Sequence, residues 1–170
     1  SFPLNHGYAI SGGKMFHVGK NNNPLSFFAV ASHGTSFSYT KEIVRNTTSN
    51  GTIFQDQNGD KYSQTTNQLV LANANYEMNH RHNINYNFML IHVNDQYVGE
   101  YGGLQTEAFQ SSPDLSGIIR RQQTNDNLLM VNQLVSDWKL SGITRLSVGA
   151  TYNRVKGLEP DRRENYFTHV

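Results

Sequence analysis

The sequence contains no cysteine, which removes several kinds of site. Without a thiol the chain has no disulfide framework, no thiolate metal site and no cysteine nucleophile. It also lacks any run of about 18 apolar residues, the minimum that predicts a transmembrane helix. Its mean hydropathy of −0.59 agrees with that absence. A membrane-spanning helix is therefore not expected.

Charge is scarce and nearly balanced. Charged residues make up 16% of the chain, and the formal net charge is +1. Lys and Arg are scattered singly except at Arg120-Arg121 and Arg162-Arg163. Nucleic acid therefore finds no contiguous basic face, and we predict no nucleic-acid partner.

Polar uncharged residues and aromatic residues dominate what is present. Asparagine is abundant, and the chain has 14 Gly, 9 Tyr and 9 Phe. Strong helix formers are scarce by comparison, a balance typical of strands joined by turns. We predict an all-β chain.

Three segments alternate apolar and polar side chains with a period of two: residues 68–76, 83–92 and 144–153. The clearest is 83–92, whose apolar side consists of Ile84, Tyr86, Phe88 and Leu90 and whose other side begins with asparagines. Such alternation predicts strands with one dry and one wet face. Residues 8–18, 25–39 and 121–138 are further strands with less regular alternation.

Lys14 is the main irregularity in the first of these strands. It falls on the same face as Ile10 and Phe16. If that face contacts lipid, the charge costs about 2–4 kcal/mol near the bilayer midplane. We expect a bulge at Gly12-Gly13 to turn Lys14 away.

The predicted connections alternate in length. Short turns are expected around residues 20–24, 79–82 and 141–142, and long polar loops over 43–65, 94–117 and from 154 onward. Outer-membrane barrels have short periplasmic turns and long extracellular loops, whereas a soluble sandwich has no reason for this asymmetry. We therefore predict an antiparallel transmembrane β-barrel segment of about six strands.

Aromatic residues lie near the ends of the apolar stretches. Tyr76 and Trp138 precede short turns, and Tyr39 and Tyr152 lie toward the long loops. An interfacial aromatic girdle predicts these positions, because amphipathic rings are best placed where lipid meets water. Ordinary strand aromatics are the alternative.

Several segments resemble a known family. The final hairpin contains residues 131–134 with residues 137–140. It is followed by residues 150–155, which contain Tyr152-Asn153, and by residues 159–165, which contain Pro160-Asp161-Arg162-Arg163. This pattern resembles the barrel of TonB-dependent outer-membrane receptors of the Bacteroidota type, and the resemblance extends over essentially all of residues 1–170. It implies a barrel of roughly 22 strands around a plugged lumen. Because the smallest membrane barrels have about eight strands, we expect a partial barrel domain without the plug and coupling segment.

The resemblance also implies a function and partners. It implies energy-coupled uptake, at the bacterial outer membrane, of a scarce nutrient such as an iron chelate, vitamin, glycan or peptide. The implied partners are outer-membrane lipid, the inner-membrane TonB complex through the missing parts of the chain, and a surface lipoprotein lid. The sequence does not identify the nutrient, and Asp161, Arg162 and Arg163 are open to two roles, ligand contact or fixing loop shape.

No other site is predicted. His80 and His82 lie in one turn without a third ligand nearby, and residues 56–60 place oxygen atoms as calcium loops do but lack the downstream bidentate Glu. The carboxylates Glu100, Glu107, Asp114 and Asp126 are scattered, with no partner for catalysis. We predict no catalytic residue, metal or cofactor, and no enzyme activity.

Two other interpretations remain open. The first is a soluble, secreted β-sandwich that binds carbohydrate through exposed Tyr and Trp. It requires the apolar faces to meet one another in a closed core. The second is a barrel segment captured as a client of an assembly or secretion machine.

Overall fold

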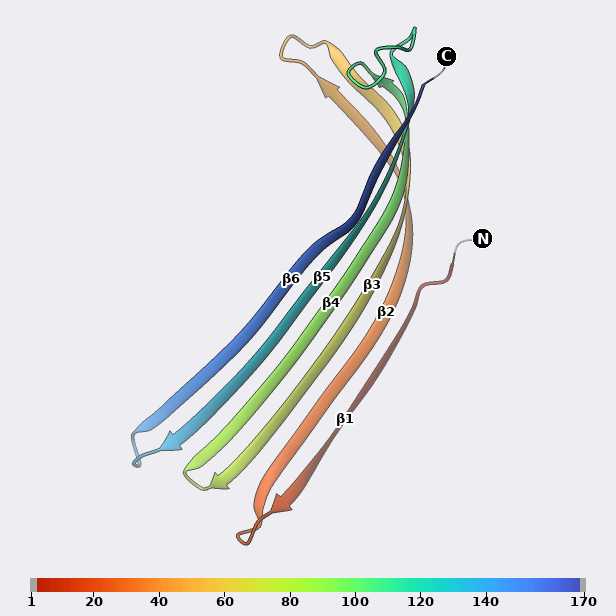
Figure 1. Cartoon of the computed structure of the whole chain (residues 1–170). Coiled ribbons are helices and arrows are strands. Elements are labelled where there is room, and N and C mark those ends of the chain that lie inside the picture. Colours follow the sequence, from red (N-terminus) through yellow and green to blue (C-terminus); the bar gives the residue numbers. More distant parts are fainter. Residues whose placement is uncertain (1–2, 169–170) are drawn as a thin grey trace.

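The computed structural model describes residues 3–168, which form one antiparallel sheet of six strands (Figure 1). The strands follow each other in chain order: β1 (His6–Val18), β2 (Asn23–Thr47), β3 (Ile53–Asn79), β4 (His82–Gln105), β5 (Ser116–Lys139) and β6 (Arg145–Thr168). No helix of the described residues has the length and apolar character needed to cross a membrane. The all-β prediction and the strand number are confirmed.

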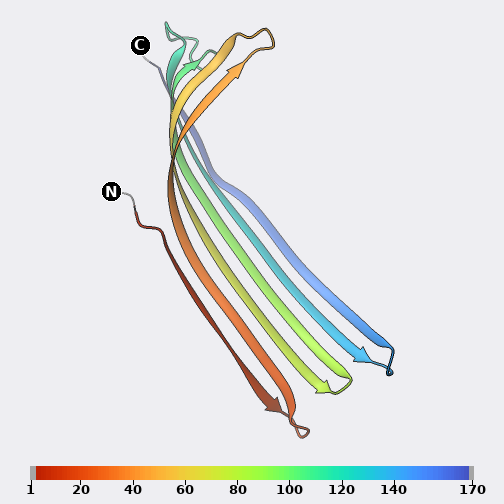
Figure 2. The ribbon, with the colours of Figure 1, turned by 180° about the vertical axis from the view of Figure 1, so that it is seen from behind.

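Every connection is a hairpin, because consecutive strands pair with each other. Residues 19–22, 80–81 and 140–144 turn at one end of the sheet, and residues 48–52 and 106–115 turn at the other (Figures 1 and 2). Left-handed backbone occurs at Gly19 (φ 77°), Asn22 (φ 54°) and Gly51 (φ 85°). Gly and Asn tolerate this conformation, so turn chemistry accounts for these reversals.

The strands are longer than the alternation predicts. β2 has 25 residues and β3 has 27, and β4, β5 and β6 have 24 each. The predicted long loops over 43–65, 94–117 and from 154 onward are therefore wrong in extent, since most of these residues are in strands. These strand ends have few apolar residues and no regular alternation of them, so in composition they resemble loops.

The expected bulge in β1 is absent. β1 pairs with β2 without a register shift from His6 opposite Thr35 to Val18 opposite Asn23. Lys14 therefore lies opposite Phe27, on that residue's face. Its Nζ lies 5.2 Å from the centre of the Phe16 ring, so the side chain extends toward the 19–22 turn.

The sheet is a single layer, and most of both faces is uncovered (Figures 1 and 2). Large apolar side chains are exposed, among them Phe27 at 47% and Val148 at 55%. The described strands do not provide the second sheet that a sandwich requires. An apolar surface of this extent marks a contact face, because water does not stabilise it.

The small buried core of the described residues lies at the far end from the short turns. Tyr101, Phe109 and Ile119 form it, and Phe109 has no exposed surface. Residues 106–115 fold over the sheet there, and the Phe109 amide donates to the Gln105 carbonyl at 3.1 Å. A Cβ at Gly117 would lie 2.5 Å from the Phe109 ring, so the ring needs a glycine beneath it.

We predict that Phe109→Ala releases the 106–115 connection from the sheet. Truncating a fully buried Phe removes about 3–5 kcal/mol of packing. Limited proteolysis should then cut within residues 106–115 much faster than in the native protein. Phe167→Ala, at a half-exposed position, is the control and should leave the cutting rate unchanged. Equal rates for Phe109→Ala and native protein would contradict the packing role.

Candidate functional surfaces

The register divides the side chains between two faces. In an antiparallel sheet, directly opposed residues project to the same side, and successive residues along a strand project to opposite sides. One row across the sheet consists of Phe27, Ala74, Tyr86, Leu134 and Ala150. We call this side the apolar face.

The neighbouring rows of the apolar face are also largely apolar. From β2 to β6 they contribute Leu25, Ala29, Ala31, Val70, Ala72, Tyr76, Ile84, Phe88, Leu90, Met130, Val148 and Tyr152. The polar exceptions on β5 have partners: Asn132 Oδ1 accepts from the Tyr86 hydroxyl at 2.8 Å, and Ser136 Oγ accepts from Trp138 Nε1 at 2.8 Å. The face is therefore continuous across five strands.

The opposite face is polar near the short turns. Asn73 donates to Asn87 at 2.6 Å and to Asn85 at 3.2 Å, and Asn87 donates to Gln133 at 3.2 Å. These amides satisfy one another across β3, β4 and β5.

The expectation of a uniformly polar opposite face is correct only in part. Farther from the short turns, two rows of this face are apolar. The first row contains Val30, Leu71, Met89 and Val131, and the second contains Leu69, Ile91 and Leu129. The alternation of residues 83–92 hides these rows, because Met89 and Ile91 continue an apolar run.

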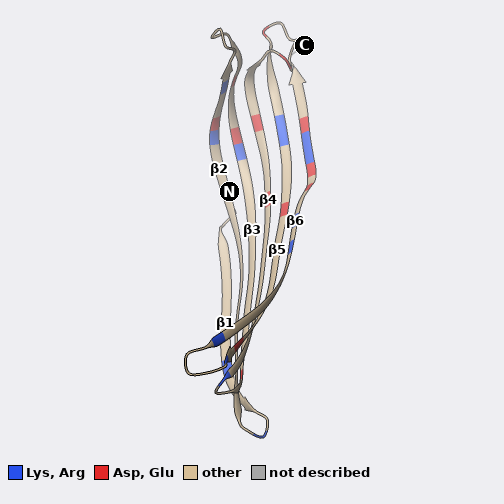
Figure 3. Ribbon diagram, turned by 90° about the vertical axis from the view of Figure 1, so that its left-hand side faces the viewer, with Lys and Arg blue, Asp and Glu red and all other residues tan. Residues whose placement is uncertain are grey.

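Charged residues avoid the middle of β2 to β6, whereas β1 has Lys14 opposite Phe27. Residues 21–40, 62–76, 82–94, 127–136 and 146–153 contain no Asp, Glu, Lys or Arg. Figure 3 places the charges in a band toward the 48–52 and 106–115 connections and again near the short turns. The band contains ion pairs between neighbouring strands, such as Lys61 with Glu42 at 3.4 Å and Arg121 with Glu164 at 2.7 Å.

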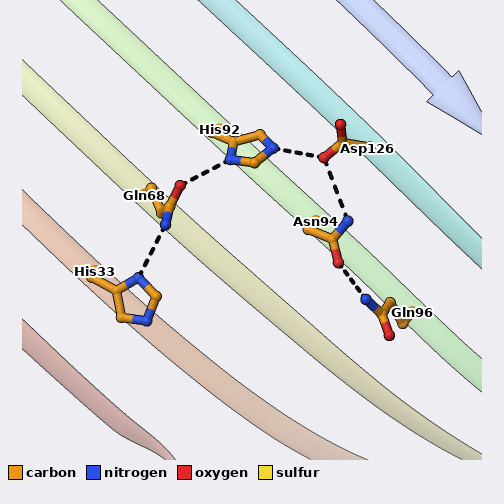
Figure 4. Close-up of polar contacts among 6 residues, drawn as sticks. All are labelled: His33, Gln68, His92, Asn94, Gln96 and Asp126. Atoms are coloured by element: carbon orange, nitrogen blue, oxygen red, sulfur yellow. Dashed lines mark hydrogen bonds and ion pairs between the residues drawn. The ribbon is translucent and has the colours of Figure 1, made fainter.

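A polar network borders the apolar face on the side of this band (Figure 4). His33, Gln68 and His92 are opposed in register, next to the row of Leu90. Gln68 lies 3.4 Å from His33 Nδ1 and 2.9 Å from His92 Nδ1, and His92 Nε2 lies 2.6 Å from Asp126 Oδ1.

The network continues toward the charged band. Asn94 donates to Asp126 at 3.4 Å, and Gln96 donates to Asn94 at 2.8 Å. Four strands contribute to it. Sequence reasoning missed it, because only strand pairing brings residues 33, 68, 92 and 126 together.

The four aromatic residues of the predicted girdle lie at different places along the strands. Trp138 stacks on His82 at 3.8 Å, next to the 80–81 turn, and Tyr76 lies near the same end. Tyr39 lies well beyond Ala31 on β2, where its hydroxyl donates to Asp60 at 2.5 Å. Tyr152 lies within the apolar rows, opposite Asn132. Tyr39 and Tyr152 therefore lie at different distances from the apolar rows, and the girdle stays a prediction.

Tyr101 fixes the end of the sheet beyond the charged band. Its ring covers Gly59 and Gly99, where a Cβ would lie 2.3 and 2.7 Å from ring carbons. Its hydroxyl donates to Glu42 at 2.7 Å. Burial and this hydrogen bond raise the Tyr101 pKa to about 12.

Asp114 closes the 106–115 connection. Its carboxylate accepts from the Ser112 hydroxyl at 2.6 Å and from the Ser116 hydroxyl at 2.5 Å. These bonds lower the Asp114 pKa to about 2. Asp114 therefore fixes the C-terminal end of this connection, where it enters β5.

The Pro-Asp-Arg-Arg element lies in β6, and its charges pair locally. Arg163 Nε lies 2.9 Å from Asp161, and Arg162 lies 3.8 Å from Glu159. Gln122 of β5 donates to Asp161 at 3.3 Å. These contacts fit a role in fixing the shape of the strand.

The other residues singled out in the sequence are not brought together. Asp56 pairs with Arg45 at 3.0 Å inside a strand pair, so residues 56–60 form no calcium loop. Glu100 pairs with Arg120, and Glu107 is exposed in the 106–115 connection. Within residues 3–168, no group of three His, Asp or Glu side chains is placed to hold a metal ion.

Comparison with known proteins adds no relative. No protein-family model matches the chain, and no curated protein sequence matches it.

We predict that Tyr101 loses its proton near pH 12, about two units above an ordinary tyrosine. Because the folded pKa is raised, the stabilisation by neutral Tyr101 is complete below about pH 10 and is lost as the pH rises toward 12. Tyrosine ionisation is followed by the absorbance of the phenolate as the pH rises. The Tyr101→Phe variant should lack one of the ionisation steps that the native protein shows near pH 12. A variant curve identical to the native curve would contradict this assignment.

Proposed function

We propose that this chain is part of the wall of an outer-membrane β-barrel, a receptor of the TonB-dependent type that takes up a scarce nutrient. The observation that carries the proposal is the uncharged apolar face, continuous in register from β2 to β6. In this proposal that face contacts the lipid, and the opposite face lines the lumen.

The length of the uncharged zone supports a bilayer crossing. Residues 82–94 of β4 are uncharged, and at about 3.3 Å per residue they extend roughly 43 Å. A tilt of about 45° reduces this to roughly 30 Å across the bilayer, and residues 127–136 of β5 give roughly 23 Å. The apolar band of outer-membrane barrels is about 25 Å tall.

The two edges of the sheet support a larger barrel. Among the described residues, β1 and β6 each have a single neighbouring strand. A long open edge is prone to pair with other strands, and a membrane leaves no unpaired backbone exposed to lipid. In the proposal, further strands pair with both edges and close a barrel of roughly 22 strands.

The resemblance to the receptors of Bacteroidota supplies the rest of the proposal. The short turns lie in the periplasm, and the 48–52 and 106–115 connections lie outside the cell. Uptake is driven through the inner-membrane TonB complex, with a surface lipoprotein lid as a further partner. The nutrient is an iron chelate, vitamin, glycan or peptide, and the chain itself performs no catalysis.

The test is the location, mass and energy requirement of the native protein. We expect it in the outer-membrane fraction, soluble only in detergent, in a chain several times heavier than 19.2 kDa. Nutrient uptake by cells should stop when a protonophore removes the energy source, while surface binding persists. A 19 kDa protein folded in plain buffer would overturn the proposal and favour the carbohydrate-binding sandwich.

A further inference from the structure

A hollow lies at the end of the sheet where the 80–81 and 140–144 turns meet. Its volume is about 530 Å³. The two hairpins that bound it are joined by a backbone hydrogen bond, in which the Lys139 amide donates to the Arg81 carbonyl at 2.7 Å. The charged residues of its lining are Glu77, Arg81, Asp137, Lys139 and Arg145.

The two acids of this hollow lie in one row of the sheet. Glu77 is opposite Asn83, and Asn83 is opposite Asp137. Both carboxylates therefore project to the same side as Asn85, on the face opposite the apolar rows. Neither carboxylate forms an ion pair within residues 3–168. The row thus offers two uncompensated negative charges to a cation.

Two cations form the next row toward the turns. Lys139 is opposite Arg145, on the same side as Asp137. Like charges that are directly opposite each other destabilise a pair of strands. No acid of the described residues forms an ion pair with Lys139, Arg145 or the nearby Arg81. An anion bound between Lys139 and Arg145 would relieve their repulsion.

The spacing of the two rows sets the size of a ligand that contacts both. Neighbouring residues on one side of a strand are about 6.6 Å apart, twice the rise per residue. An extended peptide of two residues spans about 7 Å. A dipeptide therefore brings its ammonium to the acidic row and its carboxylate to the cations. A single amino acid is too short to reach both rows.

We propose that this hollow binds a short zwitterionic peptide. Its ammonium lies between Glu77 and Asp137, and its carboxylate lies between Lys139 and Arg145, where Arg offers two parallel hydrogen bonds. The inference deepens the proposed function and rests on it in one respect, since the receptor's topology puts this end of the sheet in the periplasm. It selects peptide among the possible nutrients and gives the peptide a binding site on the exit side.

The experiment measures binding to the native, full-length protein in detergent micelles by titration calorimetry. The probes are alanyl-alanine, its N-acetylated form, its C-terminal amide, and free alanine. We expect alanyl-alanine to bind most tightly, because it alone presents both charges at the required spacing. The acetylated and amidated forms should each bind roughly tenfold more weakly, because each loses one charge-assisted contact.

Paired substitutions assign the peptide carboxylate to its row. Lys139→Ala with Arg145→Ala should weaken the binding of alanyl-alanine roughly tenfold and leave the binding of its amide unchanged. The matched control is Arg154→Ala with Lys156→Ala, which removes two exposed cations from the other side of β6. The control should leave the binding of every probe unchanged.

A second pair assigns the peptide ammonium. Glu77→Gln with Asp137→Asn keeps the shape of both side chains and removes their charges. Alanyl-alanine should bind this variant roughly tenfold more weakly, and the acetylated form should bind it as it binds the native protein. Glu77 and Asp137 are exposed, so the substitutions are compatible with folding.

Lys139→Glu separates a lost contact from a misfolded protein. It puts a carboxylate opposite Arg145, so an attractive pair replaces the repulsion. The variant should unfold at a higher temperature than the native protein and should no longer prefer alanyl-alanine to its amide. Unchanged preference in this variant would contradict the assignment of the carboxylate.

Three results would overturn the peptide site alone: equal binding of alanyl-alanine and its amide, equal binding of free alanine, or native binding by the variant that lacks both Lys139 and Arg145. Tighter binding of d-alanyl-d-alanine, a peptide of the bacterial cell wall, would overturn the assignment to a nutrient. A native protein that is folded in plain buffer would overturn the barrel, and peptide binding is measurable there too. The two failures are therefore distinguishable.

Discussion

The unbroken register between neighbouring strands is the constraint on which the other features depend. From β2 to β5 the pairing runs without a shift through the whole apolar zone. Side chains alternate with a period of two, so a slip of one residue would move every apolar residue of a strand to the other face. Because no slip occurs, Phe27, Ala74, Tyr86 and Leu134 align into one surface although they are far apart in sequence.

The same ladder separates chemical zones along the strands. Since the pairing continues beyond the apolar rows, it aligns the His33, Gln68 and His92 side chains and then the interstrand ion pairs. In these zones the backbone N–H and C=O groups bond to the neighbouring strands. The polar side chains therefore find their hydrogen-bond partners among one another. Only at the far end does the chain build a conventional core, where residues 106–115 bury Phe109 against Tyr101 and Ile119.

The sequence predicts the parts of this fold that depend on local pattern. Alternation in residues 68–76, 83–92 and 144–153 identifies three strands and their apolar sides, and Asn, Gly and Pro identify the turns around 19–22 and 80–81. The sequence predicts strands that are too short, because apolar and polar residues do not alternate regularly in residues 55–65 and 95–105. The bulge predicted at Gly12-Gly13 is absent, because β1 pairs with β2 in unbroken register. Lys14 therefore stays on the face of Phe27, and its charge lies over the Phe16 ring.

The candidate surfaces were less predictable than the strands. His92 and Asp126 are 34 residues apart, and Tyr101 and Glu42 are 59 apart, so no spacing rule joins them. Lys139 and Arg145 lie on either side of a turn in the sequence. That they are directly opposite each other follows only from the register of β5 with β6.

The central claim is that the apolar face contacts lipid, and residues 1–170 contain no cysteine of their own to compete with an introduced label. Single cysteines at positions 84 to 90 of β4 would carry a fluorophore in the native protein reconstituted into vesicles. Lipids with a quencher on the acyl chain should quench positions 84, 86, 88 and 90 and spare 85, 87 and 89. Equal quenching at all positions, or none at the even ones, would contradict the account.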